Sequence, residues 1–143
     1  MTLNFEDLRI KMVDNQLRTT DVTDKPLLQA FLDVPREKFV PAARVPLAYI
    51  DEDVLVAAAT AESGPRYLMQ PSPFAKLVQL ANVQPDDVVL DIGCATGYSA
   101  GVLSRIAGSV IALENDQSLA QQATTTLAEL GYDNVVVVSA ALQ

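Results

Sequence analysis

An acid and two glycines are spaced along residues 88–100, VVLDIGCATGYSA, in a pattern that could hold a small charged molecule. Asp91 lies near the end of an apolar run, and Gly93 and Gly97 frame a loop of small residues behind it. Glycines let a backbone turn sharply and approach a ligand, and the free N–H groups of a following helix point at the same place. Glu114 follows Gly93 by 21 residues and is suited to accept hydrogen bonds from the hydroxyls of a ribose. The two features predict a nucleoside site.

The spacing within the loop separates two classes of nucleotide cofactor. A dinucleotide-binding loop has glycines at its first, third and sixth positions, which here are Gly93, Ala95 and Tyr98, so only the first fits. An acid two residues before the first glycine and a glycine four residues after it resembles the arrangement of S-adenosylmethionine-dependent methyltransferases. Asp91, Gly93 and Gly97 meet that pattern. S-adenosylmethionine carries a sulfonium and an ammonium group and no phosphate, which suits an acidic site.

The charge of the chain excludes several other functions. Its net charge is −8, from 10 basic and 18 acidic residues, and residues 71–143 contain only two of the bases. Because no cluster of Lys and Arg could neutralise phosphates, we expect no nucleic-acid partner. The chain has no histidine, which excludes a Ser-His-Asp or Cys-His catalytic group within it. With Cys94 as the single cysteine, we expect no disulfide and no metal site.

The elements that must position the loop follow from apolar runs alternating with amphipathic stretches. Strands alternating with helices predict a doubly wound α/β fold with a parallel sheet, and such folds bind ligands at the carboxyl ends of their strands. The valine run 135–138 is expected to be buried on both faces. The predicted elements are a helix capped by Ser72 with Pro73 in its first turn, strands at 88–92, 110–113 and 135–138, and helices at 97–107 and 117–130.

The first part of the chain has a different pattern, which is mainly helical. A helix is predicted from a cap at Asp24 to a stop at Pro35, and residues 54–69 indicate an irregular hairpin. The composition changes near residue 71. The predicted domains are 1–70, a helical segment, and 71–143, the first half of a cofactor-binding domain.

No part of the sequence indicates a membrane or secretory segment. The longest apolar runs, such as 54–59, have about six residues, far fewer than the ~20 that cross a bilayer. The amino-terminal stretch MTLNFEDLRI lacks the basic region and apolar centre of a signal peptide. We therefore expect a cytoplasmic protein without a membrane partner.

Sequence blocks along nearly the whole chain resemble the protein-L-isoaspartate O-methyltransferase family. They are VPREKFVP (34–41), AYID (48–51), MQP (69–71), the loop block that runs from residue 88 to 116, and LAELGYDNVVVV (127–138), in the order and spacing of that family. The resemblance implies a Rossmann-like S-adenosylmethionine-dependent methyltransferase fold behind an amino-terminal helical segment. It also implies methyl transfer to the carboxylate of an isoaspartyl residue, a protein-repair reaction, with isoaspartyl proteins or peptides as partners.

The resemblance also assigns site residues, although it leaves the catalytic residue unknown. An isoaspartyl carboxylate is already ionised at neutral pH, so methylating it requires no general base, only placement and exclusion of water. The residues implied for cofactor binding are Asp91, Gly93, Cys94, Ala95, Gly97, Tyr98, Glu114 and Asn115. The residues implied on the substrate side are Tyr49, Asp51, Met69 and Gln70.

Three positions depart from the family pattern. Met69 stands where the family usually has an active-site serine, and a thioether cannot donate that hydrogen bond. Ala140 and Ala141 replace a glycine-aspartate pair whose acid reaches the adenine, and Ala95 replaces the middle glycine of the loop. A cofactor-binding module without isoaspartyl activity therefore stays open. A nicotinamide-dependent oxidoreductase, which the loop spacing disfavours, and a purely structural role also stay open.

The sequence stops at Gln143, directly after the third predicted strand, whereas the resembling family continues through about four more strands. We therefore expect a sheet truncated after its third parallel strand, with the first strand left as an exposed apolar edge that invites self-association. For the same reason, this chain alone is expected to have little or no methyltransferase activity.

Overall fold

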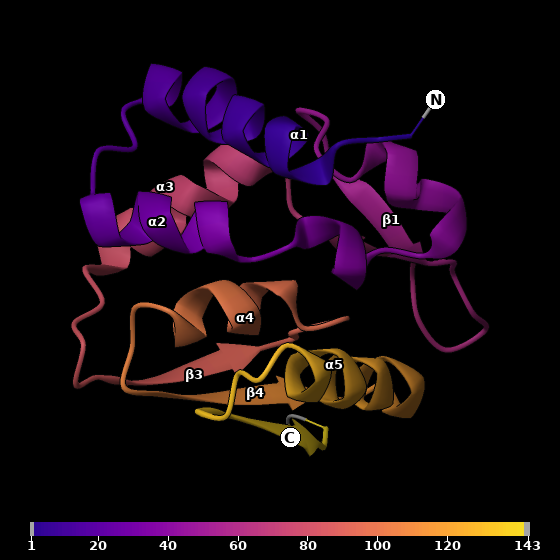
Figure 1. The fold of residues 1–143 in the computed structure, drawn as a ribbon. Helices are drawn as coiled ribbons and strands as arrows, with labels where there is room; N and C mark the ends of the chain where they lie inside the picture. The colour runs from indigo at the N-terminus through magenta and orange to yellow at the C-terminus, as the bar shows by residue number, and fades with distance from the viewer. Residues whose placement is uncertain (1, 142–143) are drawn as a thin grey trace. The chain divides into compact units, whose positions relative to one another are not determined.

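A computed structural model describes residues 2–141, which divide into two compact units between Asn82 and Val83. The first unit consists of helices and a small hairpin whose turn projects away from them (Figure 1). The helices are α1 (Phe5–Met12), the π-helix η1 (Val13–Leu17), the 3-10 helix η2 (Arg18–Thr20), α2 (Lys25–Asp33), the 3-10 helices η3 (Arg36–Phe39) and η4 (Ala42–Leu47), and α3 (Pro71–Ala81). The strands are β1 (Val54–Ala57) and β2 (Arg66–Leu68). None of the helices described in residues 2–141 is long and apolar enough to cross a membrane.

Helix α2 forms where the sequence predicts it, because the sequence has a start signal at its first turn and a stop signal after its last. The side chain of Asp24 accepts a hydrogen bond from the Leu27 amide at 3.1 Å, and Val34, just before a proline, ends the helix. Leu27 and Phe31 are buried, and the Phe31 ring packs edge-on against Phe74 with centroids 5.8 Å apart. Helix α2 thereby contributes to the core of the first unit.

The prediction that Ser72 caps helix α3 is wrong. The helix begins at Pro71, and Gln70 is its N-cap without a side-chain hydrogen bond. The Ser72 hydroxyl instead pairs with the Thr20 hydroxyl at 2.7 Å, so a tertiary contact takes the group that would have capped the helix. The irregular hairpin predicted over residues 54–69 is confirmed, since β1 and β2 pair antiparallel with a bulge.

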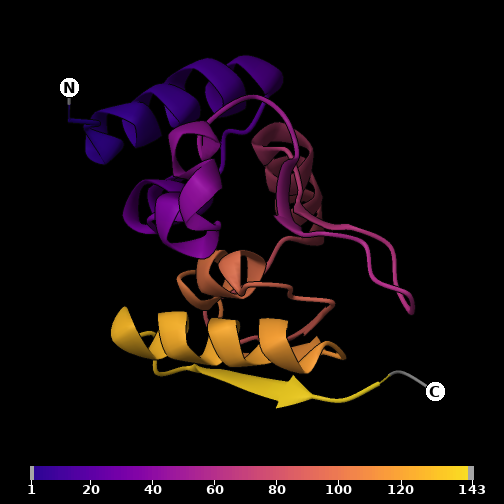
Figure 2. The ribbon, with the colours of Figure 1, turned by 90° about the vertical axis from the view of Figure 1, so that its right-hand side faces the viewer.

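The second unit is a parallel sheet covered by helices on one face. It contains β3 (Val88–Ile92), α4 (Tyr98–Ser104), β4 (Ser109–Glu114), α5 (Gln117–Glu129) and β5 (Val135–Ser139). The strands lie in the order β3-β4-β5, all parallel, and Figures 1 and 2 place α4 and α5 on the same side of them. The predicted α/β fold, with three parallel strands that follow the amino-terminal helices in the sequence, is confirmed. Helix α4 is shorter than predicted at both ends: Gly97 takes a left-handed conformation before its first residue, and the helix ends at Ser104.

The other face of this sheet is exposed within the described residues. Leu90 of β3 is 58% exposed and Val136 of β5 is 61% exposed. The expectation that the valine run 135–138 is buried on both faces is therefore wrong. Its physical reason is the period of two along a strand, which turns alternate side chains away from the single layer of helices.

Candidate functional site

The loop after β3 contains three residues with positive φ, a conformation that glycine adopts freely and that strains other residues. Gly93 and Gly97 have φ of 77° and 100°, and Ala95 between them has φ of 51°. A Cβ on Gly97 would lie 3.0 Å from the Cβ of Ala123 in α5, so this glycine also permits close packing of loop and helix. A left-handed alanine costs about 1 kcal/mol, which makes Ala95 a strained point of the loop.

Hydrogen bonds to the end of β4 hold this loop in place. The Gly93 amide donates to the Leu113 carbonyl at 2.7 Å, and the Ala95 amide donates to Glu114 Oε1 at 2.8 Å. The other carboxylate oxygen of Glu114, Oε2, accepts the Asp116 amide at 3.0 Å. Glu114 is 1% exposed. The side chain predicted to accept ribose hydroxyls therefore also anchors the loop that follows the neighbouring strand.

The second acid of the site, Asp91, lies on β3 and is bonded to the start of helix α4. The Ser99 hydroxyl lies 2.6 Å from Asp91 Oδ2 and donates to it. Burial raises the pKa of Asp91 above its ordinary value, the bond from Ser99 opposes that rise, and the charge of Glu114 adds to it. Two acids at the carboxyl ends of adjacent parallel strands thus act on one another.

No basic side chain balances these acids in the second unit. Arg105 is the one Lys or Arg in residues 83–143, and it follows the last residue of α4, at the opposite end of the helix from Ser99. Its guanidinium stacks over the Tyr132 ring at 4.1 Å and donates to Asn134. The chemistry of the donor set, two acids held by amides and a hydroxyl, fits a cationic ligand.

The remaining residues predicted for the cofactor differ in accessibility. Cys94, Ala95 and Tyr98 are buried, whereas Gly93 and Asn115 are exposed. The structure therefore brings Asp91, Gly93 and Glu114 together around the loop, and the contact of each residue with a cofactor stays a prediction. Within residues 2–141 no group of His, Cys, Asp and Glu could hold a metal ion.

Three of the four predicted substrate-side residues lie near one another in the first unit. The side-chain amide of Gln70 donates to Asp51 Oδ1 at 2.8 Å, and its backbone amide donates to Asp53 Oδ1 at 2.7 Å. Met69, the neighbour of Gln70, is 45% exposed, and its carbonyl accepts a 3.1 Å hydrogen bond from the buried Arg36. Contact of these residues with a peptide stays a prediction.

Tyr49, the fourth of these residues, is buried and lies in a network of hydrogen bonds. Its hydroxyl donates to Glu37 and accepts from Arg9 Nε at 2.9 Å and from the Arg36 amide at 3.1 Å. Arg9 also pairs with Glu37 at 3.2 Å. Burial, strengthened by the bond to Glu37, raises the pKa of Tyr49 above its usual range. The geometry gives Tyr49 a structural task, and its predicted place beside a substrate is untested.

Sequence reasoning missed several residues that organise both sites. Arg36 and Glu37 lie inside the block VPREKFVP, which marks the family but does not indicate the bonds that its charged side chains make. Arg9 bonds to residues 28 and 40 positions away, and no local pattern marks it. Ser99 lies eight residues after Asp91, and the signal for it is a hydroxyl residue in the first turn of the helix that follows the loop.

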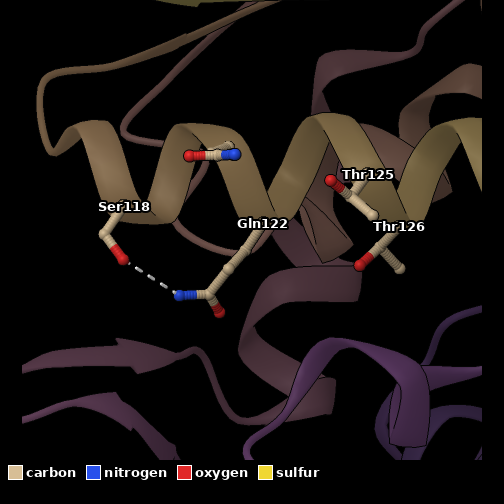
Figure 3. Close-up of a pocket in the computed structure, with 5 residues that line it drawn as sticks. Ser118, Gln122, Thr125 and Thr126 are labelled. Atoms are coloured by element: carbon tan, nitrogen blue, oxygen red, sulfur yellow. Dashed lines mark hydrogen bonds between the residues drawn. The ribbon is translucent and has the colours of Figure 1, made fainter.

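A polar pocket elsewhere in the second unit shares no residue with the predicted cofactor site. Ser118, Gln121, Gln122, Thr125 and Thr126 line it along one side of α5 (Figure 3). The Gln122 amide donates to the Ser118 hydroxyl at 3.4 Å, and no charged side chain lines the pocket. It therefore lacks the acids that distinguish the loop after β3.

Comparison with known proteins decides the family. The model of the protein-L-isoaspartate(D-aspartate) O-methyltransferase family matches residues 9–141. The chain belongs to this family. It is 38% identical to a protein-L-isoaspartate O-methyltransferase of Protochlamydia amoebophila, over 88% of this chain and 57% of that protein. It is 41% identical to one of Rhodopseudomonas palustris, over 88% of this chain and 55% of that protein. The chain spans about half the length of the curated relatives it matches.

Solved protein-L-isoaspartate O-methyltransferases have the same fold. One superposes with a TM-score of 0.81 at 27% identity and covers 92% of this chain and 41% of its own. A Plasmodium falciparum protein described as a beta-aspartate methyltransferase, solved in complex with S-adenosyl-L-homocysteine, has a TM-score of 0.71 over 97% of this chain and 64% of its own. Its identity is 21%, so this second likeness concerns the fold alone.

Proposed function

We propose that this chain carries the S-adenosylmethionine site of a protein-L-isoaspartate O-methyltransferase. The observation that carries the proposal is the pair of acids, Asp91 and Glu114, beside a left-handed loop at the carboxyl ends of adjacent parallel strands. Membership of the family supports the identity of the cofactor. The absence of any Lys or Arg near these acids in residues 83–141 favours a cationic ligand over a phosphate.

The proposed reaction is methyl transfer to the free carboxylate of an isoaspartyl residue in a protein or peptide. When bound, S-adenosylmethionine supplies an activated methyl group. The acceptor carboxylate is ionised at neutral pH, so the chain needs no residue to remove a proton from it. The tasks left to this chain are to hold the cofactor, through the loop and Glu114, and to orient the acceptor, which we assign to Asp51, Met69 and Gln70.

The first test is an amide NMR titration of this chain with S-adenosylhomocysteine, with NAD as the comparison ligand. We expect saturable shifts of the amide signals of Gly93, Gly97 and Glu114, because the loop and Glu114, which holds it, would respond together. The amides around Ser118 serve as an internal control on the same unit. Shifts with NAD alone would overturn the cofactor assignment. In an assay with isoaspartyl and aspartyl peptides, we expect little or no turnover by this chain, since it spans about half the length of its relatives.

Met69 favours a second candidate, a protein of this fold that binds the cofactor but does not methylate isoaspartyl residues. Its side chain is 45% exposed at the position where the resembling family usually has a serine hydroxyl. The two candidates can be distinguished with a relative of family length that has methionine at the position of Met69. If that relative binds S-adenosylhomocysteine but methylates isoaspartyl peptide only after this methionine is changed to serine, the second candidate holds.

The exposed side of the sheet supports self-association of this chain. Strand β3 is an edge of the sheet, and Leu90 on it and Val136 on β5 turn apolar side chains to solvent. We expect sedimentation to reveal association that rises with concentration and falls in a Leu90→Lys variant. A Ser118→Lys variant, on the helical side, is the matched control and should sediment as the unmodified chain does.

A cytoplasmic location stays a prediction of the sequence.

A further inference from the structure

The Ser99 hydroxyl joins the first turn of α4 to the carboxylate at the end of β3. It donates to Asp91 Oδ2 at 2.6 Å, a length typical of a strong hydrogen bond to an ionised acceptor. Residues on either side of Asp91, Leu90 and Ile92, are more than half exposed on the uncovered face of the sheet. The alternation along the strand therefore directs Asp91 to the face that α4 covers, where Ser99 lies.

We propose that Ser99 is a positioning residue of the cofactor site, whose hydroxyl holds the carboxylate of Asp91 in the orientation that receives the cationic part of the ligand. The inference rests on the proposed function, because it assigns Asp91 to S-adenosylmethionine. A carboxylate has about four acceptor positions, so a bond from Ser99 to Oδ2 leaves capacity for a ligand.

The charges around Asp91 explain why a neutral donor is needed there. Glu114, at the end of the neighbouring strand, is the charged group that acts on Asp91, and it disfavours the ionised form. The one cation of residues 83–143, Arg105, lies at the far end of α4 over Tyr132. A basic partner would keep Asp91 ionised but would compete with a cationic ligand. The hydroxyl of Ser99 favours the ionised form without adding a positive charge.

Three variants of the chain separate this role from a merely structural one. Ser99→Ala removes the donor, and Ser99→Thr keeps a hydroxyl at the same place. Ser118→Ala is the matched control, because Ser118 is also the second residue of a helix, and its hydroxyl only accepts a 3.4 Å contact from Gln122 (Figure 3). Circular dichroism and amide spectra establish that each variant folds.

The first readout is the pKa of Asp91 itself, followed by carbon-13 NMR of its carboxyl group. We expect it to rise in Ser99→Ala, to stay near the original value in Ser99→Thr, and to be unchanged in Ser118→Ala. A helix residue that only packs would leave this pKa where it is. An unchanged Asp91 pKa in Ser99→Ala overturns the proposal without reference to any ligand.

The second readout is the affinity for S-adenosylhomocysteine between pH 5 and pH 8. Loss of one hydrogen bond to a charged group predicts roughly tenfold weaker binding at pH 7 for Ser99→Ala, with a larger deficit at pH 5, and recovery in Ser99→Thr. Equal affinity of Ser99→Ala and the unmodified chain overturns the proposal. If the pKa of Asp91 moves as expected but no variant, nor the unmodified chain, binds S-adenosylhomocysteine, the proposed function fails, and the assignment of Ser99 to a cofactor site fails with it.

Discussion

Two networks of acidic side chains, one in each unit of this chain, have different partners. In the first unit, Glu37 lies against Arg9, and the hydroxyl of Tyr49 bonds to both of them. In the second unit, Asp91 accepts a bond from a serine hydroxyl and Glu114 accepts bonds from two backbone amides, and the one Lys or Arg of residues 83–143 lies at the far end of α4. The first arrangement is electrically balanced, whereas the second keeps its negative charge.

This difference indicates which charges serve the fold and which serve a ligand. A balanced, part-buried ion pair such as Arg9–Glu37 fixes the geometry of the helices that carry it and has no remaining charge for recognition. Acids held by neutral groups keep their field, and their burial costs stability until a cation arrives. The network of Tyr49 therefore differs from the site at Asp91 chiefly in whether its acid is paired with a basic side chain, and less in how deeply its charges are buried.

The largest expected effect comes from breaking the balanced network with Arg9→Leu. The substitution leaves Glu37 without a counter-charge and removes one donor from the Tyr49 hydroxyl. We expect a loss of about 3 kcal/mol in the free energy of unfolding, at the lower end of the range for a buried pair because Arg9 and Glu37 are only part-buried. Urea denaturation followed by circular dichroism measures it.

The matched control for Arg9→Leu is Arg18→Leu. Arg18 pairs with Asp14 at 3.2 Å, but both side chains are more than half exposed. Exposed pairs contribute less than about 1 kcal/mol, so this variant should unfold nearly as the unmodified chain does. Equal losses in the two variants would mean that the Arg9 network is no more important than a surface pair, and the contrast between the units would disappear.

A smaller effect is expected from Glu114→Gln in the second unit. Glutamine has one acceptor oxygen, so either the Ala95 amide or the Asp116 amide loses its partner. Leaving a buried donor unsatisfied costs about 2 kcal/mol, part of which is offset because a buried charge is also removed. Urea denaturation gives the stability, and hydrogen exchange at the two amides locates the loss.

Glu129→Gln, at the exposed end of α5, controls for the change in net charge. Its stability should stay within about 0.5 kcal/mol of the unmodified chain. Faster exchange at Ala95 or Asp116 in Glu114→Gln alone ties the effect to the loop. If neither amide exchanges faster, Glu114 is not the anchor of the loop in solution.

The sequence was sufficient for those features that depend on local pattern. Asp24 caps α2 as expected, and Asp91, Gly93 and Glu114 meet at the strand ends because parallel strands place their carboxyl ends together. Features that depend on distant partners could not be predicted in this way. Ser72 was expected to cap a helix, but Thr20, 52 residues away, takes its hydroxyl.

Burial was the other property that the sequence could not supply. The valine run 135–138 has the composition of a strand covered on both faces, yet Val136 is largely exposed. Composition records which residues could be buried, whereas the number of layers over a sheet depends on the elements that pack there. The network of Arg9, Glu37 and Tyr49 could not be predicted for a similar reason, since ion pairs between distant residues leave no periodic signal in the sequence.

The smallest expected effect, a gain in stability, comes from Asp91→Asn. Burial raises the pKa of Asp91 in the folded chain, so the contribution of this group is most favourable below its ordinary pKa of about 4 and is lost as the pH rises through the raised value. Asparagine stays neutral and can still accept the Ser99 hydroxyl. The variant should therefore be slightly more stable than the unmodified chain at pH 7, by less than Glu114→Gln loses, and the gain should shrink as the pH falls towards 5.

Urea denaturation at pH 5, 6 and 7 tests this, with Asp86→Asn at an exposed position as the control for net charge. The same variant should lose affinity for S-adenosylhomocysteine, because the charge that destabilises the free chain is the one that would attract the ligand. A loss of stability at pH 7, or a difference that does not change with pH, would mean that Asp91 serves the fold as Glu37 does. A gain in stability together with a loss of binding would establish that the two units use their acids for different ends.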